Sequence, residues 1–517
     1  MQMGTRSWRV HSSLFGRARR FRDLLADARA VQEQVLLRLL SHNRRCDYGR
    51  RYGFDQIRSS ADFARRVPIV TYDELQPDIA RMSAGESGVL VTEPVLMFEE
   101  TGGSSGGRKL VPYTATSLEG FRAGLLPWMD DLFTTYPTAL DGSAYWSISP
   151  AARAARRTEG GGIPIGMDND ASYFGEDLAG WIAQSLSVPP TVGGLTDIEQ
   201  WRQATACSLL ADETLAFMSI WSPTFLLELI SYMEAHAAEL QVGRIADLFE
   251  NGRLNCSRAW PRLHLISCWD QGSSRLHAGR LKERFPTAVV QGKGLLATEG
   301  LISIPLADCP WPVLAVESGY FEFLADDGET VCAADVRVGE EYEVLMTNHS
   351  GLYRYRIGDR VLVRERRGQA PALEFLGRAG LGADLVGEKL TEEFVIRVLG
   401  RLSVAGFGCL AADARGYVLL VEEAGDAGSR GVGAGSPGVG DGSRVLDELG
   451  RSCDLLLADN PQYAHARALN QLEPVKSICC PRLGERLTRA AVMNGQRLGD
   501  IKPPALLVGD WRTLLAM

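Results

Sequence analysis

Between residues 143 and 325, strand-like runs alternate with runs of helical periodicity. The strand-like runs are SAYWSIS, LHLISCW and AVVQG, and the helical runs between them include TFLLELISYMEAH and HAGRLKERF. Alternation of this kind favours an α/β architecture, because the connecting helices cover the sheet that the strands build. The sequence therefore predicts an α/β fold for this part of the chain.

The next stretch, residues 340–378, is rich in Tyr, Val and Arg between polar turns. This pattern predicts antiparallel strands in a barrel-like subdomain. A chain of 517 residues has room for two to four domains, or for one large domain and a smaller one. With 45% hydrophobic residues it can bury a large core, which excludes fibrous, collagen-like and disordered classes despite the 55 glycines.

The glycines of GRAGLGADLVGEKL, residues 377–390, are typical of a hinge. Beyond them, helical runs (TEEFVIRVLGRL, SRVLDELGRSCDLLLAD) mix with the strand-like run GYVLLVEEA. We therefore expect two domains, residues 1–378 and a smaller α+β domain over residues 379–517. Inside the second domain, the Gly-rich stretch 425–443 predicts a mobile surface loop, whose role the sequence does not reveal.

Local patterns predict four further features near the N-terminus. Apolar spacing indicates one amphipathic helix over residues 20–42, and residues 62–75 indicate a short helix followed by an extended segment. Residues 87–107 contain two β-rich runs and then a Gly/Ser loop. A helical pattern follows over residues 116–133, interrupted by Pro127.

Charge and cysteine content limit the partners and the compartment. The net charge of -9 argues against general binding to nucleic acid or to an anionic membrane, both of which need a cationic face. No run reaches the roughly 18 apolar residues of a membrane helix, and no secretory signal is present. The ten cysteines lack zinc-ligand spacing. We expect a reduced, cytoplasmic protein.

The strongest local signal is the loop TGGSSGGRK, residues 101–109. Its glycines allow close backbone approach to a ligand, its hydroxyl groups donate hydrogen bonds, and a lysine adds positive charge. The pattern lacks the Walker A spacing but predicts a phosphate loop between a strand and a helix. A flexible surface loop is the alternative. The candidate ligands are Thr101, Gly103, Ser104, Ser105 and Lys109.

Two acidic residues and two lysines are weaker candidates. Glu299, after Thr298 in LLATEG, is a carboxylate at a turn that suits a divalent metal, although a lone Glu there is usually solvated. Asp359 in YRYRIGD suits a ribose diol, and an Asp-capped turn is the alternative. Lys389 and Lys502 lie near glycines, where a mobile charge can meet a transferring phosphate or simply face solvent.

Taken in order, these motifs resemble the adenylate-forming superfamily, and more closely the Gretchen Hagen 3 family of acyl-acid amido synthetases with its bacterial members. The resemblance spans most of the chain. One departure is Gly102, which stands where the family usually has a hydroxyl residue. The stretches that carry the resemblance are HNRRCDYGRRYGFDQIRSSADFARRVPIVTYDEL, TGGSS, LLATEG, YRYRIGD, VGEKLTEEFV, NPQYAHARAL and GDIKPP.

The resemblance implies a large N-terminal adenylation domain with mixed sheets and a smaller mobile C-terminal lid. It implies ATP and Mg²⁺, a small carboxylic acid and an amine or amino acid acceptor. The 101–109 loop would hold the phosphates, Glu299 the Mg²⁺, and Asp359 the ribose, with Arg378 nearby at the domain junction. Leu295 and Leu296 would flank adenine, and Lys389 and Lys502 would reach the phosphates or the acyl-adenylate.

The resemblance leaves the acid and the acceptor open. In this fold, five aromatic residues lie in segments that should border the acyl pocket, although such residues are more often core: Trp128, Tyr145, Trp146, Trp221 and Phe225. An acyl-CoA or carrier-protein ligase shares the adenylation step and is the alternative enzyme. An inactive nucleotide-binding scaffold is the alternative outside enzymes.

Overall fold

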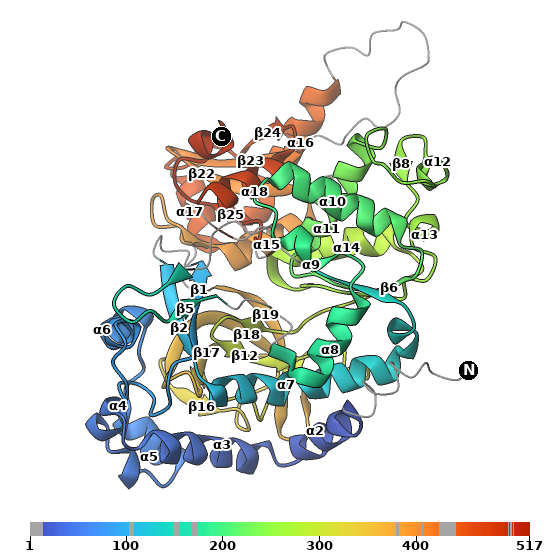
Figure 1. The fold of residues 1–517 in the computed structure, drawn as a ribbon. Helices are drawn as coiled ribbons and strands as arrows, with labels where there is room; N and C mark the ends of the chain where they lie inside the picture. Colours follow the sequence, from blue (N-terminus) through green and yellow to red (C-terminus); the bar gives the residue numbers. More distant parts are fainter. Residues whose placement is uncertain are drawn as a thin grey trace, which may run out of the picture.

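The computed structural model describes residues 14–102, 108–147, 156–166, 173–378, 382–402, 404, 407–422, 441–494, 496, 499 and 501–516. The N-terminal helices form the base of the molecule in Figure 1, and the C-terminal elements form its upper part. The helices of the base are α2 (Arg17–Leu25), α3 (Ala28–Asn43), α4 (Asp47–Arg51), α5 (Ser60–Arg66) and α6 (Tyr72–Ser83).

The helix predicted over residues 20–42 is in fact two helices, broken at residues 26 and 27. The chain turns there because α2 and α3 pack on different partners. The amide of Ala18 in α2 donates to Asp130, whereas Gln32 in α3 accepts from the amide of Phe321 on a distant strand. The segment after α5 is also shorter than predicted, since α6 begins at Tyr72.

A seven-stranded antiparallel sheet holds the predicted strands of residues 340–378. Its order is β13-β14-β19-β18-β17-β15-β16. The prediction of antiparallel strands for this stretch is confirmed. The strands are β13 (Ser303–Ile304), β14 (Val313–Leu314), β15 (Tyr320–Leu324), β16 (Thr330–Cys332), β17 (Glu341–Thr347), β18 (Tyr355–Arg367) and β19 (Ala370–Arg378).

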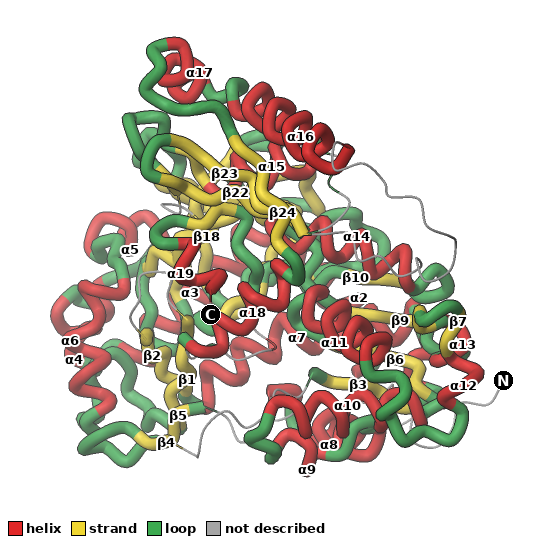
Figure 2. The backbone as a smooth tube through the Cα atoms, turned by 90° about the horizontal axis from the view of Figure 1, so that it is seen from above, coloured by secondary structure: helices red, strands yellow, loops and turns green. Residues whose placement is uncertain are grey.

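A parallel four-stranded sheet, in the order β10-β9-β6-β3, confirms the alternation of strands and helices (Figure 2). One face packs in a core with α7 and α8, and the other in a second core with α10, α11 and α14. The elements are β3 (Ser143–Trp146), β6 (Leu215–Ser219), β9 (Leu265–Ser267), β10 (Val289–Gln291), α7 (Ala115–Thr135), α8 (Glu176–Ser185), α10 (Ile198–Ala211), α11 (Pro223–Ala235) and α14 (Arg275–Arg284).

Three local predictions between residues 87 and 133 are wrong, and the first two concern a strand and a proline. The first β-rich run is buried at Leu90 and Val91 but forms no strand. Pro127 lies inside α7 without ending it, and the packing of a largely buried helix outweighs the one backbone hydrogen bond that proline removes.

The Gly/Ser loop joins two strands of a β-hairpin, β1 (Met97–Gly102) and β2 (Arg108–Tyr113), instead of a strand and a helix. The run KLVPY after the loop forms a strand because it pairs residue by residue with β1, and α7 starts only after it. The hairpin continues through β5 (Pro164–Ile165) and β4 (Arg156–Arg157) in a small mixed sheet.

The C-terminal part forms a sheet of its own in the order β24-β23-β22-β25, with two separate apolar cores. The division at residue 378 and the mobility of this part stay predictions. Of the predicted Gly-rich loop, residues 425–440 lie outside the described residues, and 441–443 are helical. The elements are α15 (Glu392–Arg401), β22 (Gly408–Asp413), β23 (Gly416–Glu422), α16 (Asp441–Leu457), α17 (Pro461–Ala468), β24 (Lys476–Cys480), α18 (Leu483–Met493), β25 (Leu506–Leu507) and α19 (Trp511–Ala516).

Within the described ranges, none of the helices combines the length and the apolar character that crossing a bilayer requires. All ten cysteines are described, and all are free thiols.

Candidate active site

Asp359 and Arg378 are cross-strand partners on β18 and β19, and the Arg378 Nε lies 3.3 Å from the Asp359 carboxylate. The predicted alternative of an Asp-capped turn is wrong, because Asp359 lies inside a long strand. Gly358 before it has φ +86°, a conformation that favours glycine. Burial raises the pKa of Asp359, and the charges of Arg378 and Lys502 oppose that shift.

Glu299 lies in the two-residue turn between β11 (Leu296–Ala297) and β12 (Gly300–Leu301). Both carbonyls of the turn are held from other elements: the Tyr113 hydroxyl donates to Thr298 at 2.6 Å, and the Asn348 amide donates to Glu299 at 2.6 Å. Glu299 is 5% exposed, so a solvated Glu is excluded.

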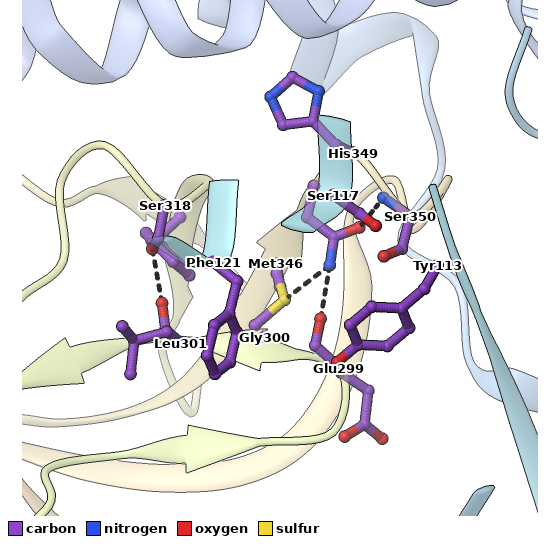
Figure 3. Close-up of a pocket in the computed structure, with 12 residues that line it drawn as sticks. Tyr113, Ser117, Phe121, Glu299, Gly300, Leu301, Ser318, Met346, His349 and Ser350 are labelled. Atoms are coloured by element: carbon purple, nitrogen blue, oxygen red, sulfur yellow. Dashed lines mark hydrogen bonds between the residues drawn. The ribbon is translucent and has the colours of Figure 1, made fainter. Parts of the chain in front are cut away.

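A cavity of about 20 Å³ lies behind this turn, and the Glu299 side chain points away from it (Figure 3). Burial raises the pKa of the Glu299 carboxyl, while Arg378 and Lys109 lower it and Asp359 adds to the rise. Glu299, Asp359 and Arg378 therefore act on one another, and we call these three residues the carboxylate cluster. Among the described residues, no group of three or more His, Cys, Asp or Glu side chains is arranged to hold a metal.

The phosphate-loop candidates are partly described. Thr101 and Lys109 face each other across the hairpin, and Thr101 is buried. The Lys109 Nζ lies 5.3 Å from the ring centroid of Tyr72, and its charge acts on Glu299. Gly103, Ser104 and Ser105 lie outside the described residues.

The structure separates the two C-terminal lysines. The Lys502 Nζ lies 4.3 Å from the ring centroid of Trp269 and 5.8 Å from that of Phe375, and its charge acts on Asp359. Lys389 is exposed with φ +47° and forms no hydrogen bond or ion pair with a described residue. Of the two lysines, therefore, only Lys502 lies next to the carboxylate cluster.

The two leucines also differ. Leu295 is buried in the main core, and its amide donates to the Ser303 hydroxyl at 3.0 Å. Leu296 in β11 is only half-buried, so it keeps surface for a ligand.

Sequence reasoning missed the tyrosines that surround the carboxylate cluster. Burial raises the pKa values of Tyr355, Tyr72 and Tyr113, and the charge of Glu299 adds to the rise in each case. Tyr355 was visible within YRYRIGD, where its position four residues before Asp359 puts both on one face of a strand.

The aromatic candidates for the acyl pocket fall into different places. Tyr145 and Phe225 belong to the second core, and Trp128 and Trp146 pack in the main core. Trp221 is half-buried. The core alternative thus holds for Tyr145, Phe225 and Trp128, while Trp146 is a partly buried neighbour of the main core.

A lysine that the sequence did not single out lies between two of these tryptophans. The Lys293 Nζ is 5.5 Å from the ring centroid of Trp128 and 5.1 Å from that of Trp221, and it donates to the Ser219 hydroxyl at 2.8 Å. We call Lys293, Trp128, Trp221 and Ser219 the lysine cluster. Its only sequence signal was a lysine within the glycine-containing run QGKG at a strand end.

Comparison with known families decides the relationship. The sequence model of the GH3 family N-terminal domain matches residues 17–248, and that of the GH3 family central domain matches residues 312–378. The chain belongs to the GH3 family. The matched ranges cover the hairpin, the parallel sheet as far as β6, and β18 and β19 with Asp359 and Arg378, whereas the turn that carries Glu299 lies between them.

Curated relatives of this GH3 chain include the probable indole-3-acetic acid-amido synthetase GH3.1 of Oryza sativa subsp. japonica. The two are 28% identical over 461 residues, 76% of this chain and 73% of the relative. The indole-3-acetic acid-amido synthetase GH3.2 of Arabidopsis thaliana is 24% identical, over 70% of this chain and 76% of the relative.

Solved structures support the same fold. AtGH3.15 acyl acid amido synthetase, in complex with 2,4-DB, superposes with a TM-score of 0.83 at 20% identity, over 98% of this chain and 96% of that one. A 2-hydroxyisobutyryl-CoA ligase in the postadenylation state has a TM-score of 0.57 at 13% identity, over 95% and 92% of the two chains. The GH3 chain thus has the α/β fold of adenylate-forming ligases.

Proposed function

We propose that this GH3 protein is an ATP-dependent acyl-acid amido synthetase. It activates a small carboxylic acid as an acyl-adenylate, releases pyrophosphate, and transfers the acyl group to an amine or amino acid. The observation that carries this proposal is that four charged residues from distant parts of the chain lie close enough to shift the pKa values of Glu299 and Asp359. Besides these two carboxylates, the four include Arg378 and Lys502. The names of the curated relatives support the same reaction.

The first step joins two anions, the acid and the triphosphate, so it requires cations and N–H donors around the phosphates. Arg378, Lys109 and Lys502 are the cations of this neighbourhood. In our proposal the loop 101–109, with Gly103, Ser104 and Ser105, holds the phosphates. Asp359 accepts hydrogen bonds from the ribose hydroxyl groups, and Leu296, with Leu295 beneath it, lies against adenine.

The Glu299 carboxylate fits a Mg²⁺ site. It is buried, its burial disfavours the charged form, and it forms no ion pair with a described residue. Mg²⁺ usually takes one or two carboxylates together with substrate phosphates, so the absence of a larger acidic group among the described residues suits it. When bound there, the ion would neutralise charge on the phosphates.

The C-terminal part, residues 379–517, would act as a lid that brings Lys502 to the phosphates and excludes water from the mixed anhydride. Two contacts support a closed arrangement in this structure: the rings of His277 and Phe407 stack at 5.2 Å, and the Thr488 hydroxyl donates to Glu228 at 2.6 Å. In our proposal Lys389 also approaches the phosphates, in another position of the lid. Ten free thiols, half of them buried, suit a reducing cytoplasm.

The test is pyrophosphate release from ATP and Mg²⁺ with a panel of carboxylic acids, in the presence and absence of amino acids, ammonia or coenzyme A. We expect pyrophosphate together with an amide product, identified by mass spectrometry. A thioester that forms only with coenzyme A would favour the ligase alternative. Bound ATP without release for any acid would favour an inactive scaffold.

A further inference from the structure

The carboxyl edge of the parallel sheet ends in a row of polar side chains. Trp146, Ser219, Ser267 and Gln291 are register partners on β3, β6, β9 and β10. Register partners of parallel strands point to the same face, here the face that packs against α7. The carboxyl edge of a parallel sheet is where ligands of open α/β folds bind.

Lys293 lies two residues after Gln291, next to this row. It is 4% exposed, and its ammonium group, which has three donor hydrogens, makes one hydrogen bond, to Ser219. No carboxylate of the described part of the chain pairs with it. The titratable group there that acts on Lys293 is the Cys268 thiol, whose pKa burial raises to about 12, so it stays neutral. Burial lowers the pKa of Lys293 to about 7.

Three more donors near this lysine are buried without a hydrogen-bond partner among the described residues: the Trp146 Nε1, the Ser267 Oγ and the Trp269 Nε1. Trp146 and Ser267 lie on the two strands adjacent to Ser219, and adjacent strands are about 4.8 Å apart. Most buried polar groups in folded proteins are paired. The described carboxylate of Asp270 lies against Gly292 but forms no ion pair with Lys293, whose one hydrogen bond goes to Ser219. The region therefore holds three unpaired donors beside a buried, unpaired lysine.

A pair of tryptophans connects this region to the carboxylate cluster. The ring centroids of Trp221 and Trp269 are 5.8 Å apart, with Lys293 against Trp221 and Lys502 against Trp269. An acid whose carboxylate reacts beside Lys502 would lie along these rings, with its far end directed to Lys293.

We propose that this enzyme activates acids that carry a second anionic group, foremost dicarboxylic acids, and that Lys293 with the unpaired donors binds that group. The inference rests on the proposed function, because it assigns the first carboxylate to adenylation. The tryptophan rings favour a flat or extended chain between the two carboxylates. The second carboxylate of the substrate would then accept hydrogen bonds from Lys293 and from these donors.

The test compares matched acids that differ only in the second carboxylate: adipic with hexanoic acid, and 4-carboxyphenylacetic with phenylacetic acid. We expect the wild type to show a higher kcat/KM for pyrophosphate release with the diacid of at least one pair. Lys293→Met should lower that value about 30- to 100-fold and change the monoacid value less than about threefold. Lys282→Met, at an exposed lysine of α14, is the matched control and should change neither.

Calorimetry of diacid binding without ATP separates this inference from the proposed function. At pH 8 the Lys293 amine is mostly neutral, so binding of the anion should take up close to one proton in the wild type and none in Lys293→Met. Titration in two buffers of different ionisation enthalpy measures this number. Equal losses for both acids of a pair, preference for the monoacids, or absence of diacid binding to the wild type would overturn the inference. Diacid binding with proton uptake but without pyrophosphate release would overturn only the proposed function.

Discussion

The carboxylate cluster and the lysine cluster are both buried, but their charges are balanced differently. In the first, Arg378 lies 3.3 Å from Asp359, and Lys109 and Lys502 add positive charge. In the second, Lys293 has two aromatic rings and a hydroxyl but no described carboxylate. A site for Mg²⁺ and phosphates must hold both signs of charge before the ligand arrives, whereas a site for one anion can leave its cation unpaired. This difference agrees with our two proposals, in which the carboxylate cluster binds the nucleotide and the lysine cluster selects the acid.

The largest effect should come from Glu299→Gln, which keeps the shape of the side chain and removes its charge. If Glu299 holds the metal, kcat/KM for adenylation should fall roughly 100- to 1000-fold, because a preorganised charge in a buried site is lost. Circular dichroism and thermal unfolding should show a folded protein. Glu329→Gln, at an exposed acid before β16, is the control. Unchanged adenylation in Glu299→Gln would remove Glu299 from the metal role.

The two C-terminal lysines provide the next test. Lys502→Met should lower kcat roughly 10- to 100-fold and change ATP binding only a few-fold, since its charge is expected to act on the phosphates during transfer. Lys389→Met should have a smaller effect on the same step, because Lys389, unlike Lys502, contacts no aromatic ring and has no ion-pair partner among the described residues. Stopped-flow measurement of adenylation and equilibrium ATP binding separate the two parameters. Equal loss of turnover and binding in Lys502→Met would contradict this assignment.

Stability should change in opposite directions in the two clusters. Lys293→Met should raise the free energy of unfolding at pH 6 by roughly 1–4 kcal/mol, because a buried, unpaired charge disappears. The folded-state pKa of Lys293 is lowered from 10.5 to about 7, so the unfolded chain binds more protons between these values. The loss of stability caused by burying the Lys293 charge is complete below pH 7 and vanishes as pH rises toward 10.5. The stability gained by Lys293→Met should therefore decrease over the same pH range.

Arg378→Met should instead lower the free energy of unfolding, by roughly 1–3 kcal/mol, because it leaves Asp359 buried without its partner. Urea unfolding of both variants at pH 6 and pH 9 measures whether each substitution raises or lowers the free energy of unfolding. If Lys293→Met is less stable than the wild type at pH 6, the Lys293 charge is compensated in the folded protein, and the description of an unpaired lysine is wrong.

The smallest effect concerns Glu228 on α11, a half-buried carboxylate that forms no ion pair with a described residue. It accepts a hydrogen bond from the Thr488 hydroxyl of α18. Burial raises its pKa to about 7, the charges of Glu485 and Glu422 add to the rise, and the Thr488 hydrogen bond and the charge of Arg202 oppose it. Because this folded-state pKa lies above the ordinary value of 4.5, stability is full below pH 4.5 and falls as pH rises through 7.

Glu228→Gln keeps an acceptor for Thr488 and removes the charge. It should flatten the dependence of the melting temperature on pH between 5 and 8 and add roughly 1–2 kcal/mol at pH 8. Thermal unfolding across this range tests the expectation, with Glu239→Gln, at an exposed acid near the end of α11, as control. An unchanged pH profile would show that Glu228 titrates normally.

Sequence patterns predicted the fold better than the site. The alternation and the antiparallel strands near residue 360 are local periodicities. The structure confirms the second, and it confirms the first from residue 143 to residue 291, after which only strands follow up to residue 325. The hairpin at residues 97–113 was mistaken for a strand and a helix, because the partner of KLVPY decides its conformation. Motif order suggested Glu299, Asp359 and Lys502 as one site, and their mutual electrostatics agree with it, although their roles stay predictions.

By itself, the sequence determined the periodicity of the elements, the family and the order of the polar motifs, since these depend on neighbouring residues. Only the tertiary structure decided which charges meet and which remain unpaired. In the sequence, Lys293 does not differ from a surface lysine. In the structure it is buried against Trp128 and hydrogen-bonded to Ser219, 74 positions earlier in the chain. The physical reason is that desolvation depends on everything packed around a group, and most of that lies far away along the chain.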